Sequence, residues 1–209
     1  MSPDEPVNEA PLNIDAEPHP TSMPRQRRAI VPAAQAQERI IAITIDLLQD
    51  LPFDQVSTRR ITEAAELGVP TISRNFGSME SLFANVCRVL LQRSVERWAK
   101  KRDSSIFLDP DFALRTRLIA WMLAEGADPA IFQTGLIDSL TQGLKDNVGP
   151  ISDRTATAYT QLSSLILQAY VVLGSTMNIP PEQFADNFAF MSYIRDQLPR
   201  IESELGWDK

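Results

Sequence analysis

A short stretch of hydrogen-bonding side chains lies between Gly68 and Gly77. Pro70 suits the first turn of a helix, and the spacing of Ile72 and Phe76 would turn both toward a core. The outward side of that helix would then carry Thr71, Ser73, Arg74 and Asn75. Arginine suits guanine, asparagine suits adenine, and a threonine methyl suits thymine, so these residue types fit base edges in a DNA groove.

The neighbouring segments predict the elements that would position this helix. Apolar residues recur at helical spacing over 33–51, where Leu51-Pro52 ends the pattern. Ser57 or Thr58 can cap a second helix over 58–67, and a fourth would run from Ser78 to about residue 102. Two short helices joined by a tight turn, with one helix before and a long one after, are typical of a helix-turn-helix motif.

Charge is distributed unevenly along the chain. The 209 residues include 20 basic and 27 acidic side chains, yet residues 25–102 carry 13 basic and eight acidic ones. The acidic chain therefore contains a basic N-terminal module that could attract phosphates. Arg59 and Arg60, at the start of the second helix, are placed for phosphate contacts. The arginines at 25, 27 and 28 could form an arm on DNA or a solvated tail.

The other segments predict an all-α fold. Residues 1–32 hold seven of the 15 prolines without a periodic apolar pattern, which indicates a disordered tail. A helix-turn-helix domain of three helices would span 33–80, with the fourth helix linking it to a helical bundle over 103–209. Within that bundle the pattern predicts helices over 109–126, 129–149, 152–173 and 181–198, with Pro199 ending or kinking the last one.

The composition gives little support to enzymatic chemistry. One histidine, His19, and one cysteine, Cys87, leave almost nothing for a catalytic triad or a zinc cluster. Asp109, Asp111 and Asp128 are interpreted as helix-start residues and not as metal ligands. We therefore expect no enzyme, no cofactor and no metal site. The absence of a targeting segment or a long apolar run favours a cytoplasmic protein.

The stretch from Arg39 to Phe83 resembles the TetR family of bacterial transcriptional regulators. Its most specific phrase is Val-Pro-Thr-Ile-x-Arg-x-Phe-Gly-Ser at 69–78. The resemblance implies a homodimer, commonly a repressor, that binds a pseudo-palindromic operator in double-stranded DNA and releases it when a ligand binds. The expected DNA-binding residues are Arg59, Arg60, Val69, Pro70, Thr71, Ser73, Arg74, Asn75 and Ser78.

The resemblance also assigns tasks to the C-terminal helices. In the family, two C-terminal helices of each subunit form the dimer interface, and we place them at 152–173 and 181–198. The candidates for burial between subunits are Tyr170, Leu173, Phe188, Met191 and Ile194. The candidates for the wall of a pocket that holds a small apolar ligand are Trp121, Met122, Phe132 and Tyr159.

Departures from the family pattern keep a second hypothesis open. Ser73 stands where the family usually has an aromatic residue, and Met79 stands where it has lysine; both positions commonly contact phosphates. Pro52 and Glu66 replace turn glycines, and a left-handed Glu66 would cost about 1–2 kcal/mol. Ser73, Met79 and the net charge of −7 favour a helical protein-interaction scaffold of the same fold that has lost DNA binding. The arginine-rich N-terminal module favours the regulator.

Overall fold

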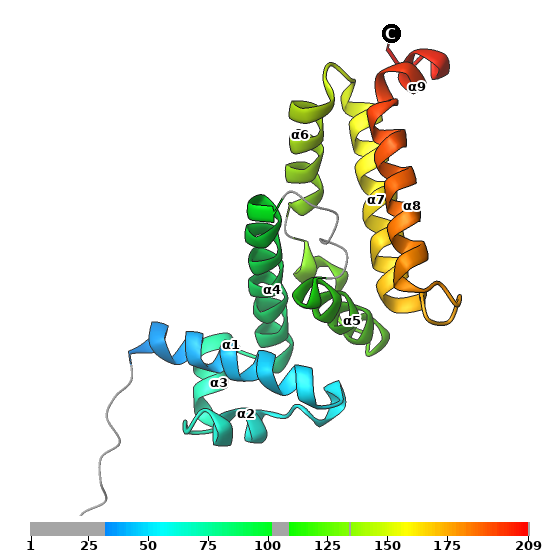
Figure 1. Cartoon of the computed structure of the whole chain (residues 1–209). Helices are drawn as coiled ribbons and strands as arrows, with labels where there is room; N and C mark the ends of the chain where they lie inside the picture. Colours follow the sequence, from blue (N-terminus) through cyan, green and yellow to red (C-terminus); the bar gives the residue numbers. More distant parts are fainter. Residues whose placement is uncertain (1–31, 102–108, 134, 209) are drawn as a thin grey trace, which may run out of the picture. The chain divides into compact units, whose positions relative to one another are not determined.

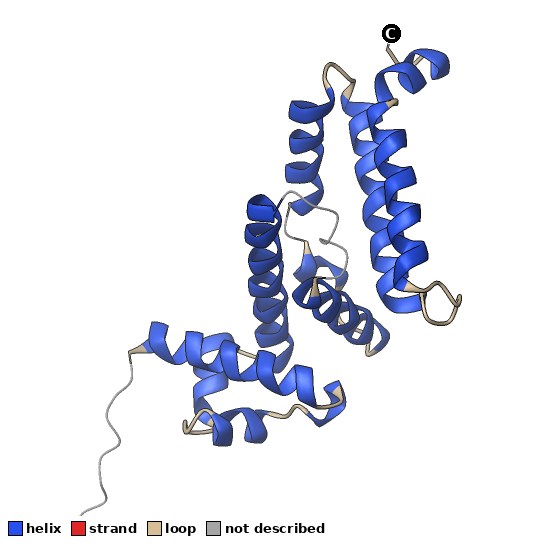
Figure 2. Cartoon of the chain, in the orientation of Figure 1, coloured by secondary structure: helices blue, strands red, loops and turns tan. Residues whose placement is uncertain are grey.

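The computed structural model describes residues 32–101, 109–133 and 135–208, and every regular element among them is helical (Figures 1 and 2). The expected all-α fold class is thus confirmed. The expected tail lies outside the described residues except for Pro32, and the arginines at 25, 27 and 28 lie outside them as well. No helix in the described ranges has the length and apolar character needed to cross a bilayer.

The N-terminal helices pack around one apolar core. They are α1 (Ala33–Asp50), α2 (Thr58–Ala64), α3 (Pro70–Phe76) and α4 (Met79–Lys101). Ile40 and Ile61 have no exposed surface, and Ile72 is 2% exposed. A short 3-10 helix over Phe53–Gln55 follows Pro52, which fits the expected end of α1 because proline cannot continue a helix.

The turn between α2 and α3 differs from the expectation. Helix α2 ends at Ala64, not at residue 67, because Glu66 takes a left-handed conformation with φ of 55°. The Leu67 N–H then donates to the Thr62 carbonyl (2.9 Å). Gly68, two residues further on, does not have a positive φ, so Glu66 itself bears a strain of about 1–2 kcal/mol. Its carboxylate binds Arg39 at 3.2 Å, which ties the turn to α1.

The same core continues into α5 (Pro110–Ala124). Leu114, Leu118 and Met122 of this helix belong to the buried cluster that includes α1, α2, α3 and α4. Figure 1 shows α4 leading from the three N-terminal helices to α5. One core therefore spans the two predicted domains, so a displacement of α5 would act on the packing of α4.

An ion pair ties the far part of α4 to the start of α5. Asp109 caps α5 by accepting from the Phe112 N–H (2.9 Å) and also accepts from the Ser94 hydroxyl (2.8 Å). Arg97 binds both Asp109 oxygens, at 2.6 and 2.7 Å, and reaches Asp111 at 2.8 Å. Burial alone would raise the pKa of Asp109, but the hydrogen bonds from Arg97, Phe112 and Ser94 outweigh it and lower that pKa. We call this set the α4–α5 clasp.

The C-terminal helices differ from the expected ones at two places, the segment 129–149 and the segment around Pro199. They are α6 (Leu136–Val148), α7 (Asp153–Leu173), α8 (Pro181–Asp196) and α9 (Leu198–Leu205). The helix expected over 129–149 is instead a 3-10 helix over Pro129–Phe132, capped by Asp128, and a separate α6. Gly135 precedes α6 with φ of 65°, a conformation that interrupts an α-helix. Pro199 lies in the first turn of α9, where proline is tolerated.

Loss of the clasp is expected to destabilise the fold. Asp109→Ala removes the ion pair and the α5 cap, so the free energy of unfolding should fall by about 2–4 kcal/mol. Urea unfolding followed by circular dichroism measures this change. Asp128→Ala is the matched control, because it removes a cap from an exposed 3-10 helix only, and it should cost less than about 1 kcal/mol. Equal losses of unfolding free energy in the two variants would show that the ion pair adds no stability beyond that of the helix cap.

The clasp also predicts a pH dependence. A lowered folded-state pKa means that the Asp109 carboxylate stabilises the fold above the unfolded value of about 3.9, and that this stabilisation is lost as the pH falls through the folded value. The difference in unfolding free energy between wild type and Asp109→Asn should therefore shrink from about pH 5 downward. A difference that stays constant over that range would contradict a role for the charge.

Candidate nucleic-acid interface and ligand cavity

Helix α3 is short because proline begins it and glycine ends it. Pro70 occupies its first turn, and Gly77 follows with φ of 80°. Ile72 is buried and Phe76 is half-buried against the same core. The two apolar residues thus face inward as expected, and the opposite side of α3 is left for solvent or a partner.

Arg74 is the exposed residue of α3 whose donors are unused. It makes no ion pair or side-chain hydrogen bond with any described residue, and its side chain is exposed. Val69 is 55% exposed beside it, and Pro70 and Ser73 are exposed as well. A free guanidinium on a protruding helix can donate two parallel hydrogen bonds to guanine.

Other polar residues of α3 make internal hydrogen bonds. The Asn75 amide donates to the Thr71 carbonyl (2.7 Å), and the Ser73 hydroxyl donates to the Pro70 carbonyl (3.2 Å). Gln37 of α1 donates to the Asn75 carbonyl at 3.3 Å. Thr71 and Asn75 are half-buried. Of the polar side chains on this helix, Arg74 is therefore the one best placed for a direct base contact.

Two arginines lie at the start of α2, and both are exposed. Arg59 binds Glu63 at 2.7 Å, with side-chain exposures of 83% and 61%. Such a pair contributes at most about 1 kcal/mol, so Arg59 can exchange Glu63 for a phosphate. Arg60 has no ion pair with any described residue. The pair of arginines therefore offers two cations next to α3.

Ser78 and Met79 both have structural tasks at the start of α4. Ser78 is exposed and accepts a hydrogen bond from the Ser81 N–H (3.0 Å), as a helix cap does. Met79 is half-buried and packs against the core. A lysine amine in that partly buried place would have to reach water, which gives a packing reason for methionine there.

A family model describes this part of the chain. Residues 40–86 match the model of the bacterial regulatory proteins of the tetR family. The match covers 47 of the 209 residues and identifies an N-terminal helix-turn-helix domain similar to those of that family. The matched residues run from α1 into α4 and include each of the nine expected DNA-binding residues. The match therefore supports a helix-turn-helix domain of the kind found in DNA-binding transcriptional regulators. No curated protein matches the chain.

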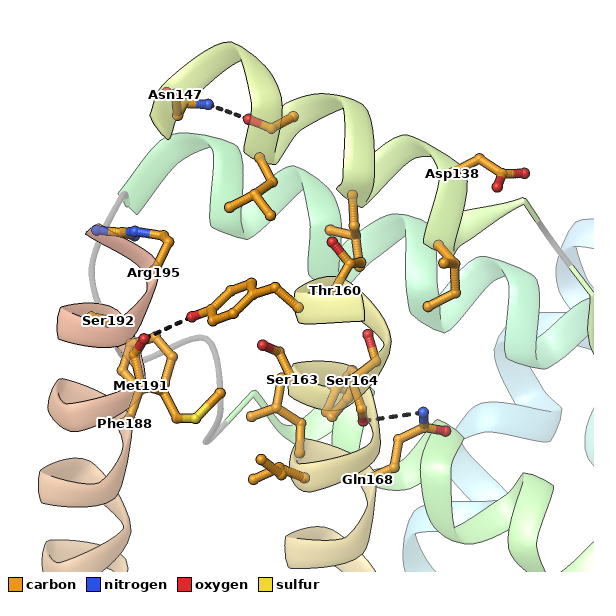
Figure 3. Close-up of a pocket in the computed structure, with 18 of the residues that line it drawn as sticks. Asp138, Asn147, Thr160, Ser163, Ser164, Gln168, Phe188, Met191, Ser192 and Arg195 are labelled. Carbon is orange, nitrogen blue, oxygen red and sulfur yellow. Dashed lines mark hydrogen bonds between the residues drawn. The ribbon is translucent and has the colours of Figure 1, made fainter. Parts of the chain in front are cut away.

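A second candidate site is a cavity of about 1260 Å³. Residues from α5, α6, α7 and α8 line it, and most of its wall is apolar. Figure 3 shows Thr160 and Ser163 of α7 across from Phe188 and Met191 of α8, with Asp138 and Asn147 on α6. The Tyr159 hydroxyl crosses between α7 and α8 and donates to the Met191 carbonyl (2.7 Å).

The expected pocket residues fall into two places. Phe132 and Tyr159 line the large cavity. Trp121 and Met122 do not; they pack into the core near the N-terminal helices, where the Trp121 ring contacts Phe53 and Phe83 edge-to-face. Helix α5 has apolar residues on more than one side, and these two belong to the side that packs into that core. Sequence reasoning missed Arg115, which lines the cavity. Its place among apolar residues at helical spacing on α5 was the signal that could have identified it.

The residues expected at the dimer interface also lie in different surroundings. Phe188 and Met191 line the cavity, and Tyr170 stacks on Phe184 with ring centroids 3.6 Å apart. Ile194 is half-buried, and Leu173 is 48% exposed. Four of the five therefore have neighbours within their own chain that reduce their exposure. Other apolar side chains of α7 and α8, among them Leu162, Leu165 and Phe190, remain exposed in the single chain.

Substitution of Arg74 should separate base readout from phosphate contact. Arg74→Ala is expected to weaken binding to a selected operator by about 1–3 kcal/mol and to relax the preference at one base pair per half-site. Arg59→Ala is the matched control and should weaken all sequences nearly alike. Fluorescence anisotropy with an operator selected from random duplexes and its single-base variants measures both. An unaltered base preference in Arg74→Ala would show that another side of α3 faces the groove.

Proposed function

We propose that this protein is a homodimeric repressor of the TetR family that holds a pseudo-palindromic operator and releases it when a ligand fills the cavity between α5, α6, α7 and α8. The observation that carries the DNA-binding part is the free guanidinium of Arg74 on a short, exposed α3. The other proposed groove contacts come from Val69, Pro70, Thr71, Ser73 and Asn75. The proposed phosphate contacts come from Arg59, Arg60 and Ser78. Operator DNA would place the protein in the cytoplasm.

Salt dependence tests the proposed DNA binding. If Arg59 and Arg60 of two protomers each neutralise one phosphate, the logarithm of the association constant should fall with the logarithm of salt with a slope of about −3 to −4. Arg60→Ala should reduce the slope by about 1 per protomer. Arg200→Ala, an exposed arginine on α9, should leave the slope unchanged. Anisotropy titrations at several salt concentrations measure these slopes.

The same titrations decide between the regulator and a scaffold that has lost DNA binding. The internal hydrogen bonds of Ser73 and Asn75 and the packed Met79 favour the scaffold. Both hypotheses share the fold, so only binding separates them. Absence of binding to every genomic fragment at low salt would support the scaffold and contradict the proposed repressor.

An apolar face on α7 and α8 supports the proposed dimer. Its members are 41% to 65% exposed in the single chain: Leu162, Leu165, Val172, Leu173, Phe190 and Tyr193. We call this set the α7–α8 face. Soluble proteins rarely expose so many large apolar side chains together, and a second copy related by a two-fold axis would cover the face with its own. This proposal moves the interface from the cavity side of the helices to their exposed side.

A charge in the α7–α8 face should prevent dimerisation. Leu165 is 63% exposed, so Leu165→Glu leaves the folded chain intact but would bury an unpaired carboxylate in the dimer. Light scattering should give the mass of two chains for wild type and of one chain for Leu165→Glu. Leu123→Glu, on an exposed apolar residue of α5, should stay dimeric. A monomeric wild type, or a dimeric Leu165→Glu, would contradict this interface.

The clasp gives the proposed ligand response a physical path. Phe112 and Arg115 of α5 line the cavity, and Asp109 and Asp111 of the same helix bind Arg97 of α4. A ligand that shifts α5 would therefore pull on α4, whose first turns pack on α3. A change in the α4 position would alter the spacing of the two α3 helices in the dimer, which must match two half-sites.

A further inference from the structure

Arg115 is a buried cation on the wall of the cavity. It lies in the middle of α5, and its exposed fraction is 6%. Its Nε is buried without a hydrogen-bond partner, and no salt bridge joins its guanidinium to a described residue. Arg115 therefore places a positive charge at the cavity wall that no described residue balances with an ion pair.

The acidic groups near Arg115 are already used. Asp109 and Asp111, on the same helix, bind Arg97. Cys87 of α4 lies close to Arg115, but burial raises the pKa of its thiol to about 11, so it is uncharged at neutral pH. Within residues 32–101, 109–133 and 135–208, no acidic side chain therefore forms an ion pair with Arg115.

The remaining charged residues of the cavity wall lie at its exposed edge. These are Asp138 of α6 and the neighbouring Arg195 and Asp196 of α8, and all three side chains are exposed. Arg195 and Asp196 bind each other at 2.8 Å. Among the residues that line the cavity, Arg115 is thus the buried charge, and water screens the others.

An unpaired buried guanidinium lowers stability, because it has lost water without gaining a partner. Burial lowers the pKa of Arg115 because desolvation disfavours the charged form of the guanidinium. An apolar residue of similar length would avoid this cost. A carboxylate would remove it, since the planar guanidinium fork forms two parallel hydrogen bonds to two carboxylate oxygens.

The rest of the wall suits an apolar body. Phe132, Ile137, Leu140 and Leu144 line one part of the cavity, and Phe188 and Met191 line another. The volume of about 1260 Å³ exceeds the range of roughly 300–1,000 Å³ that is typical for drug-sized ligands. A ligand of matching size would be a long or polycyclic molecule with few polar groups.

We propose that the cavity binds an amphiphilic carboxylate, whose anionic group pairs with Arg115 and whose apolar body lies between α6, α7 and α8. This inference rests on the proposed ligand response of the regulator and names the chemical class of its ligand. Arg115 is then the residue that selects the anion over neutral apolar molecules. It also places the ligand's charged end on α5, the helix that the clasp joins to α4.

Matched pairs of anionic and neutral probes test the proposal. Decanoate is compared with decan-1-ol, and cholate with methyl cholate, by calorimetric titration of the full chain. Wild type should bind at least one anion at least tenfold more tightly than its neutral counterpart. Arg115→Met should weaken that anion about tenfold to a hundredfold and leave the neutral probe nearly unchanged. Arg117→Met, an exposed arginine two residues away, should bind both as wild type does.

Several results would overturn the proposal. Wild type without a preference for either anion would contradict it, and so would a preference that survives in Arg115→Met. Circular dichroism checks that the variant folds; Arg115→Gln takes its place if it does not, with the same expectation. Arg115→Lys retains the charge without the fork and should keep part of the preference.

DNA release is measured separately, so that the two proposals fail in different ways. Anion binding that depends on Arg115 but does not release the operator would refute the ligand response and leave the ligand class standing. Release caused equally by decan-1-ol and decanoate, or by methyl cholate and cholate, would refute the ligand class and leave the response standing.

Discussion

The carboxylate of Asp109 organises the junction on which the rest of the molecule depends. It caps α5 through the Phe112 N–H, accepts from Ser94 and binds Arg97 of α4 with both oxygens. Because it is almost fully buried, its charge would be unfavourable without these partners. The clasp therefore holds α4, which carries the N-terminal helices, against α5, which forms part of the cavity wall.

Helix α5 is the element that joins the two candidate sites. Its acidic start binds Arg97, its apolar residues Leu118 and Met122 complete the N-terminal core, and Arg115 reaches the cavity. Residues of this one helix thus contact Arg97 of α4, the N-terminal core and the cavity. A ligand anion at Arg115 would act on a helix that cannot shift without disturbing α4, and this gives the proposed response a mechanical basis.

Much of the N-terminal part was predictable because its signals are local. Pro70 and Gly77 bound α3, Ser57 caps α2, and the spacing of Ile72 and Phe76 identifies the inner side. The sequence was less informative where a tertiary contact overrides a local preference. Glu66 bears a strained conformation beside Arg39, and the break before α6 at Gly135 replaces a helix that the apolar pattern predicted as continuous.

The sequence by itself determined the all-α class and indicated the helix-turn-helix domain, since the motif is contiguous and its helix is short; the residues of α3 that would meet DNA stay a prediction. Only the tertiary structure decided which side of each C-terminal helix meets which neighbour. Trp121 packs against Phe53, whereas Phe188 and Met191 face the cavity, and Leu165 and Phe190 stay exposed. Helices α5, α7 and α8 are apolar on more than one side, and helical periodicity identifies a side without identifying its partner. The unpaired state of Arg115 likewise depends on residues distant in the chain, so no local pattern could reveal it.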